Sequence, residues 1–231
     1  MKRKLKIEIG LAVLLLLIAL FGSFLAPYDP LKVNYDFSLQ PPSFLHIFGT
    51  DKLGRDVFSR ILCGAKTSFG LTFLMLFLIV FIGMIVGLIA GLSNDKVESF
   101  FNNIINGLLA FPDTIFAIAI VGIVGAGLFN TVFALALIWW TKYARLTLAL
   151  VKQEKKKNYL VMAQMSGVPT LQRIIRYLLP NILSQILVTA FLDIGNMMIS
   201  LAGLSFLGLA SQPPQPEWGA MLYAVSYTHL R

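Results

Sequence analysis

The residues best suited to chemistry lie in a long apolar run near the carboxyl end of the chain. Asp193 and Asn196 stand there beside Met197 and Met198. A carboxylate with nearby thioethers suggests metal binding, but first-row divalent metals that favour nitrogen and oxygen need larger ligand sets than one aspartate. We therefore expect Asp193 to pair with a polar group on a neighbouring helix, the methionines to pack, and no metal site.

Other catalytic groups are sparse in the sequence. The only histidines are His46 and His229, no H-E-x-x-H motif occurs, and Cys63 is the single cysteine. Neither a catalytic metal site nor an intramolecular disulfide is expected from such a set. The phosphate-binding motif G-x-x-x-x-G-K-[ST] is also absent from the sequence. We expect no catalytic residue, no cofactor and no ATP hydrolysis by this chain.

A second group of polar residues lies in the stretch FGTDKLGRDVFSR, residues 48–60. Its apolar residues recur at helical spacing, which indicates an amphipathic helix at the outer membrane interface; they are Leu53, Val57, Phe58, Ile61 and Leu62. Asp56 and Arg60 are one turn apart on the other face. We expect them to form a solvated ion pair rather than a catalytic one.

The composition identifies the protein class. Of the 231 residues, 57% are hydrophobic and only 13% are charged, whereas soluble domains have about 45–50% apolar and about 25% charged residues. The mean hydropathy is +0.78. The net charge of +8 would also suit nucleic-acid binding, but the basic residues are not interleaved with base-stacking aromatics. The sequence therefore predicts an all-α, polytopic transmembrane helical bundle.

Five mostly apolar runs are long enough to cross a bilayer, which needs about 17–25 residues. They are Ile9–Ala26, Phe69–Leu92, Ile104–Val124, Leu128–Val151 and Ile182–Leu209. Lysine and arginine are more frequent in the segments that this arrangement places inside than in the first outer loop. The positive-inside rule therefore predicts a cytoplasmic amino terminus and a cytoplasmic segment between the last two spans.

Three features inside the spans predict local structure. Gly83, Gly87 and Gly91 repeat every fourth residue, which favours close packing of two helices. Pro112 followed by Asp113 indicates either a kink at the interface or part of a polar pathway, and we favour the kink. In the fourth span, aromatic side chains are expected at the headgroups, with basic side chains reaching toward them; these residues are Trp139, Trp140, Tyr143, Lys142 and Arg145.

The segment Lys152–Asn181 is basic and partly apolar, and it lies between two spans. Gly167 suits a helix end at positive φ, and Pro169 suits the first turn of a following helix. Two short helices meeting at the glycine are therefore predicted. We expect a partner or a neighbouring helix to cover their apolar side chains, which include Leu171, Ile174, Ile175 and Leu178. The alternative is an interfacial loop that only joins two spans.

The spacing of Ala163, Gly167 and Leu179-Pro180 resembles the "EAA" loop of importer permeases of the ATP-binding-cassette (ABC) class. Val161 and Met162 replace the usual Glu and first Ala of that loop. Other stretches resemble the permeases of the dipeptide, oligopeptide and nickel group. Within that group the sequence resembles the C-type subunit of the nickel permease most. These stretches are FGTDKLGRDVFSR, Tyr143-Ala144-Arg145, LDIGNMMISLAGLSFLGL and PPQPEWGAM.

The resemblance implies a permease subunit of an ABC importer in the bacterial cytoplasmic membrane. It implies translocation of nickel, or a nickel chelate, with ATP hydrolysed by partners; a dipeptide or oligopeptide is the alternative substrate. The implied partners are a sister permease, two cytoplasmic ATPases, an external solute-binding protein and membrane lipid, without nucleic acid. Ala163, Gly167, Leu179 and Pro180 would belong to the ATPase-coupling loop. An ATPase-independent channel or structural membrane protein is the alternative of another class.

The resemblance and the apolar pattern together give a domain organisation. Residues 1–26 form the cytoplasmic amino terminus and first helix, and residues 27–68 form an external loop with the interfacial helix. Residues 69–221 form the permease transmembrane domain, which contains the coupling loop 152–181. Asp193 and Asn196 are candidates for the translocation path. Residues 222–231 match nothing expected of the family, so we expect a non-native tail in place of the family's sixth helix.

Overall fold

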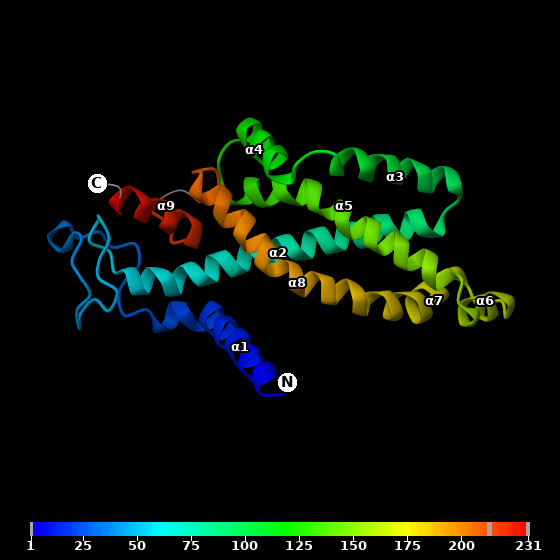
Figure 1. Cartoon of the computed structure of the whole chain (residues 1–231), viewed down its shortest axis with the longest axis horizontal. Coiled ribbons are helices and arrows are strands. Elements are labelled where there is room, and N and C mark those ends of the chain that lie inside the picture. Colours follow the sequence, from blue (N-terminus) through cyan, green and yellow to red (C-terminus); the bar gives the residue numbers. More distant parts are fainter. Residues whose placement is uncertain (1, 212–213, 230–231) are drawn as a thin grey trace. The chain divides into compact units, whose positions relative to one another are not determined.

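The computed structural model describes residues 2–211 and 214–229 (Figure 1). Over this part of the chain the secondary structure is helical without a strand, and one isolated bridge joins Thr50 to Asp56. The prediction of an all-α, polytopic helical bundle is confirmed.

The helices follow one another along the chain, with short connections between α2 and α8. In order they are α1 (Lys2–Leu25), the 3₁₀-helix η1 (Tyr35–Phe37), α2 (Val57–Leu92), α3 (Asp95–Leu109), α4 (Asp113–Val124), α5 (Leu128–Lys155), α6 (Asn158–Met165), α7 (Thr170–Arg173), the π-helix η2 (Ile174–Leu178), α8 (Leu179–Phe206) and α9 (Trp218–His229).

Within the described residues, four helices are long and apolar enough to cross a membrane. They are Lys6–Leu25, Val57–Leu92, Leu128–Lys155 and Thr170–Phe206. The pair α3 and α4 adds a fifth crossing if it counts as one broken span. The number of expected spans therefore agrees with the structure, although the third span differs in form.

The chain separates into two compact units, and the long helices contribute to both. Unit 1 comprises the residues up to Phe73, Val124–Thr131 and the residues from Met198 onward. Unit 2 comprises Leu74–Ile123 and Val132–Met197. The basic segment between the last two spans belongs to unit 2.

In unit 2, α2 packs against α5 through the three glycines that the sequence singled out. A Cβ atom at Gly83 would lie 2.5 Å from the Cβ of Tyr143, and one at Gly87 would lie 2.6 Å from the carbonyl oxygen of Ala144. At Gly91 it would lie 2.7 Å from a methyl carbon of Val151. The predicted close packing is confirmed, because any side chain on this face would separate the two helices.

The third predicted span, Ile104–Val124, is not one helix. Asn94 caps α3 by accepting from the backbone N–H of Val97 at 3.1 Å, so this helix begins well before Ile104. It ends at Leu109, and α4 leaves at 86° to it. Pro112 explains the break, since its ring and missing N–H stop the hydrogen-bond ladder. Asp113, on the first turn of α4, is exposed.

In unit 1, the predicted interfacial helix is not a separate element, because α2 runs from Val57 to Leu92 without a break. The expected Asp56–Arg60 pair is also wrong. Asp51 pairs with Arg55 at 2.7 Å and lies 3.6 Å from Arg60, whereas Asp56 contacts His46 at 2.9 Å.

Three of these charged residues, Arg55, Asp56 and Arg60, are buried rather than solvated, and the preceding loop covers them. The backbone N–H of Asn34 donates to the Leu53 carbonyl at 3.0 Å, and the N–H of Tyr28 donates to the Ser59 hydroxyl at 3.1 Å. Arg60 donates to the carbonyl of Pro30 at 2.8 Å. The loop therefore folds back over the start of α2. The partners of these charged residues are determined by this loop rather than by their spacing along a helix.

The carboxyl end of unit 1 is held by Glu217, a fully buried carboxylate. Its oxygens accept from the backbone N–H groups of Gly219 at 3.0 Å and Ala220 at 2.9 Å, which caps α9. The indole N–H of Trp218 donates to the carbonyl of Ile61 at 3.1 Å. Within the predicted tail, α9 continues to His229, and residues 230–231 lie outside the described residues. A non-native origin of residues 222–231 stays a prediction.

Gly87→Ala tests the glycine face. We expect a lower melting temperature in detergent, because overpacking costs about 1–3 kcal/mol and alanine gains only up to about 1 kcal/mol over glycine as a helix former. Gly70→Ala is the control on the same helix, since nothing lies within 4 Å of a Cβ there. It should leave the melting temperature unchanged or raise it. Equal effects of the two substitutions would contradict a close approach of α2 and α5.

Candidate functional site

The basic segment 152–181 begins where α5 ends, and one carboxylate holds the next helix to it. Glu154 is buried; it accepts from the ammonium of Lys157 at 2.5 Å and from the hydroxyl of Tyr159. Burial, and then the hydrogen bond to Glu154, raise the pKa of Tyr159 to about 12. The hydroxyl therefore remains a donor at neutral pH, and the start of α6 is fixed to the end of α5.

Gly167 ends α6 as the sequence predicted, with φ at +75°. Its N–H donates to the carbonyl of Gln164 at 3.1 Å, and the N–H of Val168 donates to that of Ala163 at 3.1 Å. This pair of bonds is a Schellman motif, which needs the left-handed conformation that glycine adopts without a steric cost. Pro169 then occupies the N-cap position of α7, one residue before the predicted first turn.

The second helix of the segment is not short, in contrast to the prediction. Residues from Thr170 to Phe206 form one continuous helix of 37 residues through α7, η2 and α8. The N–H of Leu179 donates to the carbonyl of Ile174, a π-helical bond. Pro180 follows, and its missing N–H explains why the regular α-helical ladder is interrupted here. The side-chain amide of Asn181 donates to the carbonyl of Tyr177 at 2.6 Å, an additional contact at this turn.

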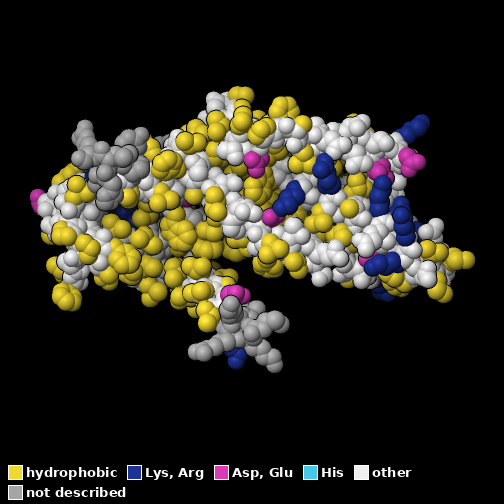
Figure 2. Space-filling view, viewed as in Figure 1, with side chains coloured by type: hydrophobic (Ala, Val, Ile, Leu, Met, Phe, Trp, Pro, Cys, Tyr) yellow, Lys and Arg dark blue, Asp and Glu magenta, His cyan; other side chains and the backbone are white. Residues whose placement is uncertain are grey.

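Five apolar side chains around Gly167 are exposed, and we call them the apolar coupling surface; they are Val161, Met162, Met165, Leu171 and Ile175. Met165 is 83% exposed and Leu171 is 69% exposed. Of the residues expected to need cover, only Leu178 is fully buried. Figure 2 shows Lys and Arg side chains gathered over α5 and α6, near exposed apolar side chains. An exposed apolar patch of this kind marks a surface for another protein or for a membrane.

Asp193 lies on α8, where its buried carboxylate forms an ion pair with a half-exposed lysine of α5. The ammonium of Lys142 donates to both carboxylate oxygens, at 2.8 Å and 2.6 Å, and the hydroxyl of Tyr143 donates at 2.9 Å. The side chain of Asp193 is 6% exposed and that of Lys142 is 50% exposed. The expected pairing of Asp193 with a neighbouring helix is confirmed. Asn196, one turn further along α8, is exposed.

The headgroup position expected for Tyr143 and the reach of Lys142 toward the headgroups stay predictions, and the structure shows contacts of both residues that the sequence pattern did not indicate. Lys142 lies midway along α5 with Asp193, and Tyr143 is fully buried against the glycine face of α2. The pairing of Lys142 with Asp193 is favoured because either ion alone would be costly within a membrane-spanning helix. The signal in the sequence was a lysine among few charged residues in the fourth span and a single aspartate in the otherwise uncharged fifth span.

Two further polar contacts join α3 to α5, and sequence reasoning missed both. Arg145 donates to the side-chain carbonyl of Asn106 at 2.6 Å, and the ammonium of Lys152 pairs with Glu98. In Figure 1 the two helices run side by side. Lys155 also donates to the carbonyl of Gly91 at 3.1 Å, which satisfies the end of α2. Within the described part of unit 2, polar contacts therefore connect α5 to α2, α3, α6 and α8.

Tyr143→Phe removes the hydroxyl that donates to Asp193 and keeps the aromatic ring. We expect a lower melting temperature, with a loss of about 1 kcal/mol, typical of a hydrogen bond between membrane helices. The loss should be smaller in an Asp193→Asn background, where the charge-assisted bond no longer exists. A double-mutant cycle of melting curves measures the difference. Equal losses in both backgrounds would show that the hydroxyl and the carboxylate do not interact.

The chain matches two known families. A profile described as binding-protein-dependent transport system inner membrane component matches residues 83–228, more than half of the chain. A second, described as the N-terminal TM domain of oligopeptide transport permease C, matches residues 9–42. The two matched ranges cover most of the apolar helices described above.

Three curated relatives align over most of the chain. The di/tripeptide transport system permease protein DppC of Pseudomonas aeruginosa is 40% identical, over 92% of this chain and 73% of its own length. The nickel transport system permease protein NikC of Escherichia coli is 34% identical, over 90% and 76%. The glutathione transport system permease protein GsiD of Shigella flexneri is 40% identical, over 91% and 70%. The chain therefore belongs to the ABC importer permeases of the dipeptide, oligopeptide and nickel group, which are multi-pass proteins of the bacterial inner membrane.

Proposed function

We propose that this chain is the permease subunit through which partner ATPases drive uptake of a small solute. The observation that supports the proposal is the apolar coupling surface, which is exposed and lies on both sides of the turn at Gly167. The partner that we propose for this surface is a cytoplasmic ATPase. One ATPase would contact this chain, and a second would contact a sister permease. An external solute-binding protein would deliver the substrate.

The coupling role is assigned to four residues within the segment. Ala163 and Gly167 form the Schellman turn that holds α6 against α7, so they set the shape presented to the ATPase. Leu179 and Pro180 lie at the π-helical interruption, where the helix from α7 passes into α8. Because this helix is continuous from Thr170 to Phe206, a displacement of α7 by the ATPase would be carried into the membrane span.

The translocation path is proposed to pass beside Asp193 and Asn196. Asp193 is a carboxylate in a membrane-spanning helix, and such groups usually face a bundle interior or a water-filled path. Asn196 is exposed on the adjacent turn of α8. Both lie downstream of the coupling segment on the same continuous helix, so closure of the ATPases would move them together.

For the substrate we propose a small peptide first and nickel second. Two of the relatives, each 40% identical to this chain, are a di/tripeptide and a glutathione permease, and the nickel permease is 34% identical. The nickel prediction rests on the resemblance of the stretch 192–209, including Met197 and Met198, to nickel permeases. The external binding protein would make the main choice between substrates.

Met165→Glu tests the coupling surface. Removing an exposed apolar contact and adding a charge should reduce both the amount of ATPase that copurifies with the permease and the uptake rate, because a charge at the core of an interface is costly to desolvate. Ser99→Glu is the control, since it adds the same charge at an exposed position on α3. Unchanged copurification with Met165→Glu would argue that the ATPase docks elsewhere.

The substrate is decided by uptake into cells that carry the complete transporter with and without this subunit. We expect loss of the subunit to abolish uptake of labelled dipeptide and excess nickel not to compete. Loss of nickel uptake that dipeptides do not inhibit would favour the nickel prediction instead. If uptake of dipeptide and uptake of nickel were both unchanged without the subunit, the proposed function would be contradicted.

A further inference from the structure

One face of α5 carries several exposed cations, which a lipid-facing surface would not carry. Lys142, Arg145, Ala149 and Lys152 are exposed, and at 3.6 residues per turn they fall within an arc of about 80°. Only the small Ala149 is apolar in this set. A lipid-facing surface would carry large apolar side chains, since each cation in hydrocarbon costs several kcal/mol. This face of α5 is therefore suited to water rather than to lipid.

The cations on this face differ in how they are neutralised within the chain. Lys142 is paired with Asp193, and Lys152 is paired with Glu98. Arg145 donates to the neutral amide of Asn106, and among the described residues it has no carboxylate within ion-pair distance. The face thus presents one uncompensated positive charge, flanked by two neutralised pairs.

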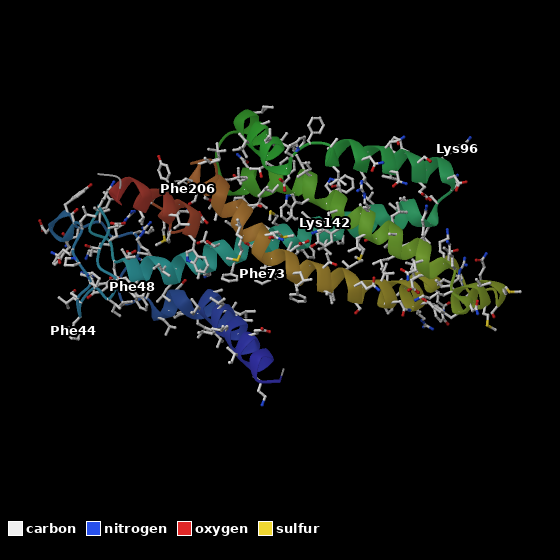
Figure 3. The ribbon with its side chains drawn as sticks, in the orientation of Figure 1. Phe44, Phe48, Phe73, Lys96, Lys142 and Phe206 are labelled. Atoms are coloured by element: carbon white, nitrogen blue, oxygen red, sulfur yellow. The ribbon has the colours of Figure 1, made fainter. Side chains whose placement is uncertain are left out.

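The donors that remain on this face match a carboxylate. A guanidinium has five N–H donors in a planar fork, of which Arg145 uses one toward Asn106. Lys142 has three N–H donors and directs two contacts to Asp193. The two residues are three positions apart, so their side chains emerge from adjacent turns of one helix face. Figure 3 labels Lys142 on this part of α5.

We propose that Arg145, with Lys142 beside it, binds a carboxylate of the substrate on a water-filled path along α5. This inference rests on the proposed function, because it requires a solute to move past the helix. Arg145 would bind the carboxylate through two N–H groups, the geometry in which guanidinium is most selective. The third N–H of Lys142 would add a weaker contact. A peptide carboxyl terminus and the carboxylates of a metal chelate share this chemistry.

The test uses Arg145→Cys in a Cys63→Ser background of the assembled transporter in proteoliposomes, with sister permease, ATPases and binding protein. Uptake of alanyl-alanine should fall about tenfold or more, as expected for loss of a charged hydrogen bond. Lys96→Cys in the same background is the matched control, because Lys96 is exposed on α3 away from this face (Figure 3). Its uptake should equal that of the parent.

Chemical modification of the introduced thiol then tests charge and access to water. A methanethiosulfonate that adds an ammonium should restore much of the uptake, and one that adds a sulfonate should not. Alanyl-alanine should slow the modification, whereas its carboxyl-terminal amide should not. For a chelated metal, nickel citrate should slow the modification of the thiol, whereas free nickel ion should not.

Four results would overturn the inference: full uptake by Arg145→Cys, no reaction of the thiol, equal rescue by both reagents, or equal protection by peptide and amide. Protection that depends on phosphatidylglycerol rather than on the substrate would assign Arg145 to a lipid headgroup and would also overturn it. These results differ from failure of the proposed function, in which the unmodified transporter itself imports neither alanyl-alanine nor nickel.

Discussion

The structure depends on the requirement that ions within the bilayer have partners. Asp193 is the clearest case, because its carboxylate is buried on α8 and receives donors from both Lys142 and Tyr143 on α5. Breaking such a pair leaves one uncompensated charge, so the contact fixes how far along each helix the other must lie. The same helix α5 meets α3 through Glu98 and Asn106. Polar contacts thereby set the register of the helices of unit 2.

The packing of α5 against α2 determines the distance between the two helices rather than their register. Gly83, Gly87 and Gly91 let the backbone of α2 approach Tyr143 and Thr147 to a separation that no side chain would permit. Lipid tails are as apolar as leucine, so close van der Waals contact must supply part of the stabilisation that water would supply for a soluble protein. Tyr143 belongs to both contacts, since its Cβ lies against Gly83 and its hydroxyl reaches Asp193.

Local patterns in the sequence predicted the features that depend on neighbours along the chain. The apolar runs, the glycine repeat and the positive φ of Gly167 are of this kind, because length, spacing and backbone strain are local properties. The partners of charged residues were not predictable in the same way. Asp56 contacts His46 and not Arg60 because a loop folds back over α2. The continuous helix through Pro180 was missed because a π-helical turn accommodates the absent N–H without ending the helix.

The proposed coupling follows from how stiff each connection in the segment is. Glu154 ties the start of α6 to the end of α5 through Lys157 and Tyr159, so α6 is not free to swing alone. Beyond Gly167, the chain enters a single helix that reaches Asp193 without a loop. A push on α7 would therefore act along a helix on the Asp193–Lys142 pair, while α6 holds the carboxyl end of α5. On the proposed function, relative motion of α5 and α8 would strain that ion pair, which makes it the place where ATPase closure and the solute path meet.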